Sequence, residues 1–527
     1  MHLTIHDQDK TTRTIGAASG QTLLDALRSA GETMLAPCGG AGTCGRCRIL
    51  VRDAEGIDYR LACQTPATDG VEIIMEDIGA MRVEGAPASP ARTENAEARS
   101  EDAEAQAHGG ESPRKAPSPL GLAIDIGTTT MVFYLVDLDT RKVMGATGKV
   151  NPQAAFGADV IARINAASTP EGMRMLCGLL RTCIDQGRAD LCRTFGADSS
   201  RIVRTALAGN TVMEHFAAGL DPSSIGVTPF TPRSLFGAEL SLYSENEGAS
   251  ENAYFAPAVA GYVGGDITAG LHVSGMAQRE EVQLFIDIGT NGEMALGNRT
   301  RMLCCATAAG PAFEGASITF GMPAMPGAIA QASLTEKGFD IETIDGKKPL
   351  GLCGSGLLDA VACLVEAGIV DETGYLSSKD EVEATFAHLI GEEHGQTVCY
   401  LDAERRVYLT QKDIRCVQLA KAAFRAGIET MMETYGVGCG DIDTVFLAGG
   451  FGMHMRPASA ERIGLIPPAL GNRITALGNA AGKGAVEALF DEGKQGIEQV
   501  ATRCEYLELS CSPLFNERYI EAMEFGD

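Results

Sequence analysis

Four cysteines near the start of the chain have the type and spacing of metal-cluster ligands. Cys38, Cys44, Cys47 and Cys63 are separated by five, two and fifteen residues. Three thiolates on one short loop, with a fourth supplied from further along the chain, suit a 2Fe–2S cluster. Such a cluster accepts and releases single electrons. The cysteines therefore predict electron transfer.

The loop that carries these cysteines is close to the plant-type iron–sulfur spacing, with one extra residue between the first two ligands. Its glycines would let the chain wrap closely and direct backbone N–H groups at the sulfurs. Two alternatives are a four-cysteine zinc site and unrelated core thiols. Zinc usually takes two close pairs separated by a longer stretch, whereas three of these cysteines lie within ten residues.

The elements needed to position the cysteines occur in residues 1–80, which we predict to form a β-grasp domain of the ferredoxin type. Leu23, Leu24 and Leu27 recur at helical spacing. The predicted elements are strands at 3–5 and 14–15, a helix at 22–30 ended by Gly31, and strands at 48–51 and 71–75.

Residues 81–119 have a different composition. This stretch is rich in alanine, proline, serine and glutamate and has almost no large apolar residue, so it cannot build a core. We predict a disordered, flexible linker with an average span of roughly 35 Å. Such a linker would let the iron–sulfur domain move between an electron donor and an acceptor.

Two similar turns follow, each between apolar strand patterns. The first begins at Asp125 and the second at Asp287, 162 residues further on. The repetition predicts a duplicated α/β fold of two lobes over residues 120–527, with a ligand between them. The residues after each aspartate that we expect to contact that ligand are Gly127, Thr128, Thr129, Thr130, Gly289, Thr290, Asn291 and Gly292.

A third glycine-rich turn, Gly449, Gly450, Phe451 and Gly452, follows a buried strand pattern at 445–448. Before it we predict a long helix from Gln411, with Thr410 and Asp413 as a capping box and Gly436 as its end. The apolar stripe of this helix is explained by packing against a core. Its members are Ile414, Val417, Phe424, Ile428 and Met431.

Each aspartate–glycine turn offers backbone N–H groups and hydroxyls to a phosphate, and its aspartate can hold a hydrated Mg²⁺. One such turn is weak evidence, but two copies followed by the glycine turn at 449–452 are far more specific. Other nucleotide motifs are excluded by inspection. Gly482-Lys483 is followed by Gly484 and not by the serine or threonine of a P-loop, and no early strand leads into a G-x-G-x-x-G turn.

Composition narrows the class of protein. The chain has 527 residues, enough for two or three domains, and a formal charge of −26, which argues against nucleic-acid or anionic-membrane binding. No run of eighteen apolar residues predicts a transmembrane helix, and the N-terminus does not have the pattern of a signal peptide. With sixteen cysteines, we expect a cytoplasmic protein in a reducing compartment, in which Cys304 and Cys305 are core residues.

The three turns together resemble the phosphate and adenosine motifs of the ASKHA superfamily of sugar and acetate kinases, heat-shock chaperones and actin. Asp125 with residues 127–129 matches the first phosphate loop, and Asp287 with residues 289–292 matches the second. Residues 449–452 match the adenosine turn. The resemblance implies an actin-like ATPase fold that binds ATP and Mg²⁺.

A plant-type ferredoxin domain joined to such an ATPase is similar to the reductive activators of corrinoid-dependent enzymes. Further runs typical of that family are found at 260–266, 308–315, 353–356 and 418–423. The resemblance implies ATP-dependent, one-electron reduction of Co(II) to Co(I) in a corrinoid protein or corrinoid-dependent methyltransferase. Asp125 and Asp287 would position Mg²⁺ and the attacking water, and a reductase or ferredoxin would donate electrons.

Other functions stay open on the sequence alone. One is an ASKHA metabolite kinase with an appended redox-sensing ferredoxin domain. Another is an electron-transfer protein in which the nucleotide acts only as a conformational latch. A third is the ATP-driven reduction of an aromatic thioester, although the sequence has no clear second group of cysteines for the extra cluster such systems use. Whether the chain forms a homodimer also stays open.

Overall fold

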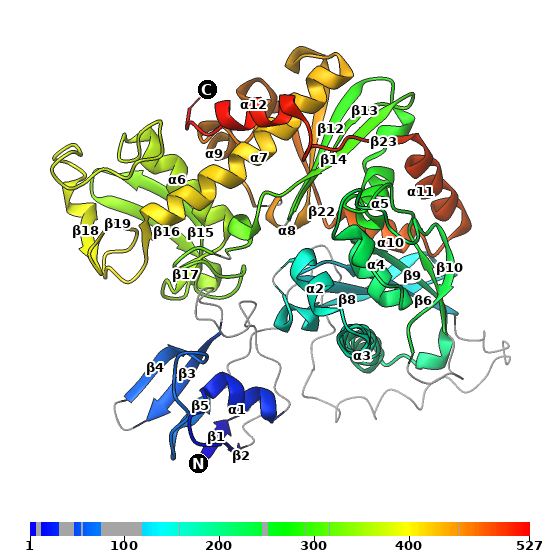
Figure 1. The fold of residues 1–527 in the computed structure, drawn as a ribbon, viewed down its shortest axis with the longest axis horizontal. Coiled ribbons are helices and arrows are strands. Elements are labelled where there is room, and N and C mark those ends of the chain that lie inside the picture. The colour runs from blue at the N-terminus through cyan, green and yellow to red at the C-terminus, as the bar shows by residue number, and fades with distance from the viewer. Residues whose placement is uncertain are drawn as a thin grey trace, which may run out of the picture.

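The structure is a computed structural model (Figure 1). The residues that it describes are 1–6, 12–30, 47–53, 56–74, 118–157, 159–244, 251–289, 291–315, 317–452 and 454–526. Throughout these residues, every helix is too short or too polar to cross a lipid bilayer.

The N-terminal unit is a five-stranded sheet in the order β2-β1-β5-β3-β4, with helix α1 beside it (Figure 1). Its elements are β1 (His2–His6), β2 (Thr12–Gly16), α1 (Leu23–Ser29), β3 (Arg48–Asp53), β4 (Gly56–Leu61) and β5 (Glu72–Ile74). Thr22 begins the helix, since its Oγ1 accepts from the backbone N–H of Asp25 at 3.2 Å. The predicted β-grasp domain is confirmed, and β4 is an addition to the predicted strands. The predicted helix end at Gly31 lies outside the described residues.

Most of the predicted linker also lies outside the described residues. Ser118 and Pro119, its last two residues, are described. The Arg201 guanidinium donates two hydrogen bonds to the Ser118 carbonyl oxygen, from Nε at 3.1 Å and from Nη2 at 2.6 Å. The first lobe therefore holds the chain just before its first strand begins.

The first lobe is built on a six-stranded sheet in the order β10-β11-β9-β6-β7-β8. Helix α3 covers one face, where Phe133 packs among leucines of α3 in a buried core. The elements of this lobe are β6 (Leu120–Ile126), β7 (Thr130–Asp137), β8 (Lys142–Val150), α2 (Val160–Ala166), α3 (Pro170–Phe195), β9 (Ile202–Gly209), α4 (Thr211–Ala218), β10 (Ala238–Ser241) and β11 (Asn252–Phe255).

The second lobe repeats this plan with a sheet in the order β22-β21-β12-β13-β14-β23. In both lobes the strand that ends at the aspartate pairs with an antiparallel strand on one side and a parallel strand on the other. Cys304 and Cys305 are fully buried in this sheet, as predicted. The strands are β12 (Val282–Ile288), β13 (Gly292–Gly297), β14 (Met302–Thr307), β21 (Ile442–Ala448), β22 (Ile474–Gly478) and β23 (Cys504–Tyr506).

Helices α5 (Gly265–Ser274) and α10 (Ala480–Glu487) lie together between the two sheets (Figure 1). Their contact is made by small residues, because a Cβ added to Gly484 would lie 2.5 Å from the Cβ of Ala269. One buried core joins these helices to the first sheet and another joins them to the second. This arrangement confirms the predicted actin-like fold.

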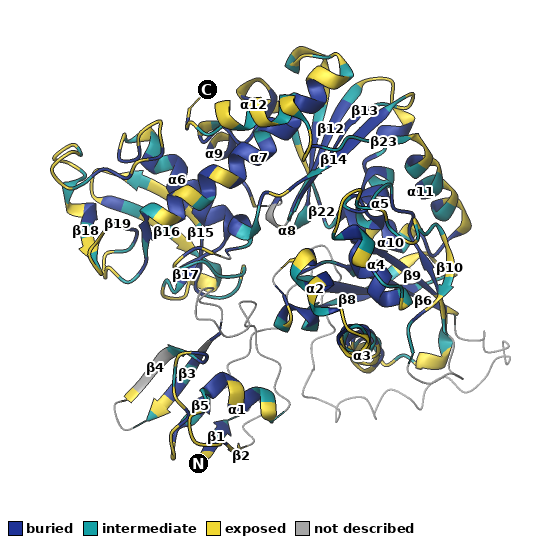
Figure 2. Cartoon of the chain, in the orientation of Figure 1, coloured by how far each residue is buried: buried dark blue, intermediate teal, exposed yellow. Residues whose placement is uncertain are grey.

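The second lobe carries further elements around helix α7 (Figure 2). The predicted capping box at Thr410 and Asp413 is present, Gly436 ends the helix in the left-handed conformation at φ 86°, and the predicted apolar stripe is buried. The remaining elements are β15 (Ala328–Thr335), β16 (Gly338–Thr343), β17 (Gly351–Leu352), α6 (Gly354–Glu366), β18 (Ile390–Glu393), β19 (Gln396–Tyr400), β20 (Tyr408–Thr410), α7 (Gln411–Tyr435), α8 (Gly449–Gly452), α9 (Pro457–Arg462), α11 (Asp491–Arg503) and α12 (Pro513–Glu521).

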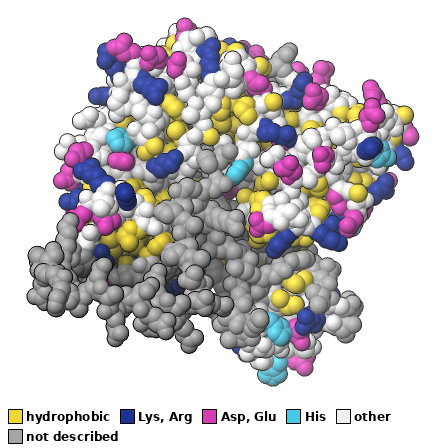
Figure 3. All heavy atoms as spheres, turned by 180° about the vertical axis from the view of Figure 1, so that it is seen from behind, with side chains coloured by type: hydrophobic (Ala, Val, Ile, Leu, Met, Phe, Trp, Pro, Cys, Tyr) yellow, Lys and Arg dark blue, Asp and Glu magenta, His cyan; other side chains and the backbone are white. Residues whose placement is uncertain are grey.

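The surface of the two lobes mixes charges of both signs. On the face shown in Figure 3, Lys and Arg side chains are scattered among Asp and Glu side chains and do not gather into one basic area. A nucleic-acid-binding surface needs a cluster of Lys and Arg to meet the phosphates. The part of this face that the structure describes does not offer one.

Candidate nucleotide and iron–sulfur sites

Two of the four predicted cluster ligands are described, and the fold brings them together. Cys47 lies immediately before β3, and Cys63 lies in the turn after β4, the strand paired with β3. The backbone N–H of Cys63 donates to the Sγ of Cys47 at 3.4 Å, and both thiols are buried. Cys38 and Cys44 lie outside the described residues. The buried sulfurs and the N–H donor fit a 2Fe–2S cluster, whose potential depends on such hydrogen bonds.

The first predicted phosphate loop is the tight turn between β6 and β7. The backbone N–H of Gly127 donates to the Thr130 carbonyl oxygen at 2.9 Å, and a Cβ on Gly127 would lie 2.7 Å from that same oxygen. Glycine is therefore required for this turn. Thr128 is buried within it.

Buried polar side chains fix the first turn from behind. Arg163 of α2 is fully buried, and its Nη2 donates to the Thr128 carbonyl oxygen at 2.5 Å. The Nδ2 of Asn151 donates to the Gly127 carbonyl oxygen at 2.9 Å. With these carbonyl oxygens bonded from behind, the turn is held rigidly and a positive charge lies beneath it.

The first turn also contacts the second lobe directly. The hydroxyl of Thr129 donates to Oε2 of Glu314 at 2.9 Å. Glu314 is the next-to-last residue of the predicted family run at 308–315 and ends a short 3-10 helix at Pro311–Glu314. This hydrogen bond joins the two lobes at the place where the phosphates are predicted to bind.

The second predicted phosphate loop is the turn between β12 and β13. The backbone N–H of Gly289 donates to the carbonyl oxygen of Asn291 at 3.1 Å. Gly292 begins β13 so close to Phe424 that an added Cβ would lie 2.5 Å from its ring. Thr290 lies outside the described residues. Both predicted turns thus connect two antiparallel strands, but the second is one residue shorter: Ile126 pairs with Met131 in the first lobe and Ile288 pairs with Gly292 in the second.

The predicted adenosine turn is a single helical turn, α8, directly after β21. Gly449 has φ 84°, and a Cβ there would lie 2.7 Å from Oδ1 of Asp287. A Cβ on Gly450 would meet nothing within 4 Å. Gly449 therefore serves the close approach of α8 to the second turn. The side chain of Phe451 lies outside the described residues.

The two turn aspartates lie among other carboxylates between the lobes. Burial raises the pKa of Asp125 to about 7, opposed by the Nδ2 of Asn479, which donates to its Oδ2 at 2.7 Å. Burial and then the charges of Asp266 and Glu314 raise the pKa of Asp287 to about 7. The same two causes, burial and neighbouring carboxylates, raise the pKa of Glu293 well above its ordinary value. The site therefore gathers several buried acidic groups that raise one another's pKa values.

Sequence reasoning missed the role of Asp266. This residue lies in the first turn of α5, where burial and then the charge of Asp125 raise its pKa to about 7. Asn479 caps α10 beside Asp125. Both central helices therefore begin at the site, and their N-terminal dipoles favour anions there. The run at 260–266, singled out in the sequence as typical of the family, ends at Asp266 and leads into this helix.

These carboxylates fit a hydrated cation better than a directly ligated one. Among the described residues, no three acidic, histidine or cysteine side chains are close enough to hold a metal ion. Asp125, Asp266 and Asp287 nevertheless interact through their charges. Mg²⁺ usually keeps several waters and is held by one or two carboxylates together with substrate phosphates. The residues present therefore fit a Mg²⁺–nucleotide.

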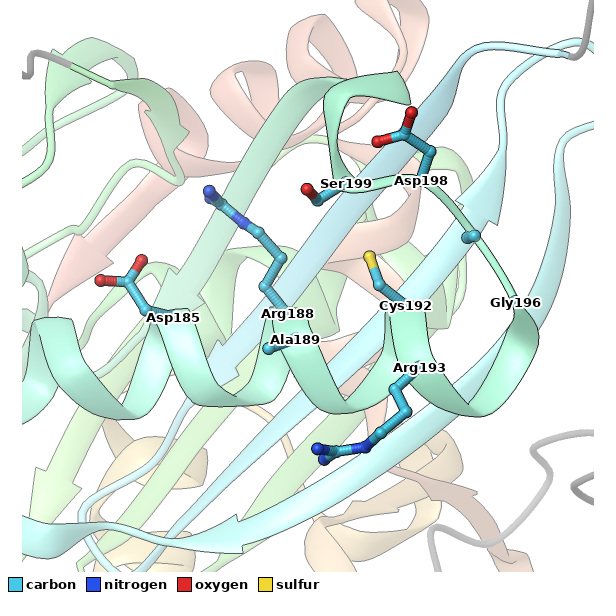
Figure 4. A pocket seen from close by; sticks show the side chains of 9 residues that line it. Asp185, Arg188, Ala189, Cys192, Arg193, Gly196, Asp198 and Ser199 are labelled. Carbon is cyan, nitrogen blue, oxygen red and sulfur yellow. The ribbon is translucent and has the colours of Figure 1, made fainter.

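A groove on the surface of a helix lies away from this site. It has a volume of about 630 Å³ and runs along the C-terminal half of α3, on the outside of the first lobe (Figure 4). Asp185 and Arg188, which line it, form ion pairs with Arg181 and Glu251 respectively. None of the predicted site residues lines it. We assign it no part in the chemistry.

Comparison with known proteins divides the chain in the same way. Residues 5–68 match the 2Fe-2S iron–sulfur cluster binding domain family. Residues 120–279 match the RACo middle region, and residues 281–527 match the C-terminal domain of RACo, the ASKHA domain. The corrinoid activation enzyme RamQ of Eubacterium limosum is 34% identical over 422 residues, which cover 77% of this chain and 70% of that protein. The chain belongs to the family of corrinoid reductive activators.

Two further members of this family are similar to the chain. A solved structure of a reductive activator for corrinoid, iron–sulfur protein matches 99% of this chain and 98% of its own, with 30% identity and a TM-score of 0.70. A [Co(II) methylated amine-specific corrinoid protein] reductase of Methanosarcina barkeri is 22% identical and covers 76% of each chain. The matched iron–sulfur and ASKHA domains confirm the predicted cluster-binding domain and nucleotide-binding fold.

Proposed function

We propose that this protein uses ATP to reduce the cobalt of a corrinoid protein from Co(II) to Co(I), one electron at a time. The observation that carries the proposal is the group of carboxylates from both lobes, joined in one chain to an iron–sulfur domain. The activities of the relatives support a corrinoid protein as the substrate. The cluster, bound by Cys38, Cys44, Cys47 and Cys63, supplies the electron, which a reductase or ferredoxin replaces.

The need for ATP follows from redox potentials. Plant-type clusters have reduction potentials of about −400 mV. Reduction to Co(I) requires a lower potential, so the transfer runs uphill. For one electron, each deficit of about 59 mV lowers the equilibrium constant tenfold, about 1.4 kcal/mol. Binding and hydrolysis of ATP are the source of free energy that the ASKHA domain offers.

In the proposed hydrolysis, different residues bind the phosphate, position Mg²⁺ and accept a proton. The first turn binds phosphate through its backbone N–H groups and the hydroxyls of Thr128, Thr129 and Thr130. Asp125 and Asp287 position Mg²⁺ through its water shell. Asp266 accepts the proton of the attacking water as that oxygen bonds to the γ-phosphorus and the bond to ADP breaks. A pKa near 7 suits a general base at neutral pH.

Conformational coupling follows from the contact between the lobes. Because Thr129 of the first lobe bonds Glu314 of the second, phosphate bound at Thr129 competes with a link between the lobes. ATP can drive the cycle only if it favours one arrangement of the lobes over another. We propose that the ATP-bound arrangement binds the corrinoid protein in a state that is easier to reduce, and that hydrolysis resets it.

The experiment is anaerobic spectroscopy of the complete reaction. The reduced, cluster-loaded protein is mixed with Mg²⁺, ATP and a Co(II) corrinoid protein, and the Co(I) absorption band is recorded. We expect the band only when ATP is present. The variant Cys63→Ala should still hydrolyse ATP but form no Co(I). ATP hydrolysis without any Co(I), even with an intact cluster spectrum, would contradict the proposal and favour the nucleotide latch.

A further inference from the structure

A buried glutamate behind the site has no role in the reaction described so far. Glu214 of α4 is fully buried. Neither of its carboxyl oxygens makes a hydrogen bond of good geometry among the described residues, and the nearby backbone N–H of Gly209 lowers its pKa by less than burial raises it. Burying a carboxyl group without partners is costly. Such a group therefore needs a reason to be kept at this position.

The position of Glu214 connects it to the proposed base. A Cβ added to Gly265 would lie 2.6 Å from Oε1 of Glu214, so the carboxyl group packs against the backbone of the residue before Asp266. The hydroxyl of Thr211, which begins α4, donates to the Ala260 carbonyl oxygen at 2.8 Å. Helix α4 is thus fixed to the segment that leads into α5, and Glu214 lies directly behind its first turn.

The surroundings of Glu214 decide its charge. Burial raises its pKa well above the ordinary value, and the charge of Asp266, facing it from α5, raises the pKa further. From β11 it is faced by Tyr254, whose own pKa is raised in part by Glu214. His215, next along α4, is engaged elsewhere, with the Thr211 carbonyl oxygen and the backbone N–H of Arg233.

We propose that Glu214 is a positioning residue for Asp266: its carboxyl group, lodged behind Gly265, fixes the first turn of α5, on which Asp266 lies. The inference rests on the proposed function, in which Asp266 takes the proton of the attacking water. Since a misplacement of about 1 Å can cost about 100-fold in rate, the support behind a base matters as much as the base.

The test compares Glu214→Gln with Glu214→Ala in the full-length, cluster-loaded protein. A neutral amide keeps the shape and the lack of charge, so Glu214→Gln should retain the ATPase kcat within about threefold, with the same pH profile. Glu214→Ala should lower kcat about 10- to 100-fold with little change in the KM for ATP. The matched control is Glu498→Gln. Glu498 lies on α11 and accepts a hydrogen bond from the Tyr254 hydroxyl, and its glutamine variant should have the ATPase kcat of the wild type.

Amide hydrogen exchange over residues 265–268 supplies a readout that does not depend on catalysis. We expect faster exchange there in Glu214→Ala and unchanged exchange in Glu214→Gln. Unchanged exchange in Glu214→Ala, or a Glu214→Gln variant as slow as Glu214→Ala, would overturn the inference. If the two variants exchange as expected but the wild-type protein hydrolyses no ATP, the proposed function is overturned, and with it the kinetic part of this inference.

Discussion

The two aspartate–glycine turns share a backbone plan but differ in what lies behind them. The turn after Asp125 is backed by the buried guanidinium of Arg163, which bonds the Thr128 carbonyl oxygen. The turn after Asp287 is surrounded by carboxylates, and the charges of Asp266 and Glu314 raise the pKa of Asp287. Both turn aspartates lie among carboxylates, but the first turn also has a buried guanidinium bonded to its backbone from behind.

This difference indicates a division of labour. A positive charge behind backbone N–H groups favours an anion, so the first turn is suited to the phosphates. A group of carboxylates favours a cation, so the second turn is suited to Mg²⁺. Substitutions in or behind each turn, measured by ATPase activity, ATP binding and stability, test this division.

The largest effect is expected from Asp287→Ala. Loss of this carboxylate should lower the ATPase kcat by at least about 100-fold, because the positioned cation neutralises charge in the transition state. The Mg²⁺ dependence of the residual activity should weaken, while the visible spectrum of the cluster should stay that of the wild type. Steady-state assays over a range of Mg²⁺ concentrations check this. Turnover equal to that of the wild type would refute the role of Asp287.

The next effect is expected from Arg163→Met. This change leaves the carbonyl oxygens of Thr128 and Gly157 without the donors that they have in the wild type, inside the protein. We expect the first lobe to lose about 3 kcal/mol of stability and ATP affinity to fall. Thermal unfolding and calorimetric titration measure the two effects. Arg163→Lys keeps a charge but loses the fork of donors, so its stability and ATP affinity should lie between those of the wild type and Arg163→Met. An Arg163→Met protein with wild-type stability and ATP affinity would contradict the comparison.

A smaller effect concerns pH. The pKa values of Asp125 and Asp287 are raised from 3.8 to about 7, so the folded protein keeps protons that the unfolded chain releases between these values. The contribution of these two groups to the free energy of unfolding of the nucleotide-free protein should therefore fall as pH rises from about 4 to about 7 and level off above that range. Denaturant titrations at several pH values check the slope. Asp125→Asn and Asp287→Asn should each flatten it, and a rise of stability with pH would contradict the shifts.

The smallest effect is expected from Gly449→Ala, with Gly450→Ala as its control. Alanine at φ 84° is strained by about 1 kcal/mol or more, and its Cβ would press on Oδ1 of Asp287. We expect a modest loss of stability and weaker Mg²⁺–ATP binding. Gly450 has open space around it, so its alanine variant should be close to the wild type. If the two variants have the same stability and the same Mg²⁺–ATP affinity, the close approach of α8 to Asp287 does not matter for binding.

The sequence predicted elements well where local rules govern them. The α7 helix begins and ends where its capping box and Gly436 predicted, because caps act within a few residues. The strand–turn–strand units were found because apolar runs and glycine turns are local patterns. The strand β4 was missed although Ile57, Tyr59 and Leu61 alternate with polar residues in it, as in a half-buried strand, and the structure pairs it with β3.

The site was predicted only in part, for a physical reason. The residues of the turns can be recognised in the sequence by their type and spacing. Asp266, Glu314 and Glu214 act because long-range packing brings their elements together, and no local pattern encodes that meeting. Arg163 is the clearest case. A single arginine in a short amphipathic helix reads as a surface residue, yet it is fully buried beneath the first turn.

The glycine and alanine contact between α5 and α10 has a mechanical consequence. Gly484 meets Ala269, and a Cβ on Gly270 would lie 3.4 Å from that of Ala480, so few bulky side chains interlock across this pair. Helices with such smooth faces can slide past one another by small steps with little loss of packing. The two helices also start at the proposed ATP site, beside Asp125. A shear along their axes would carry a sub-ångström change at the phosphates outward to both sheets.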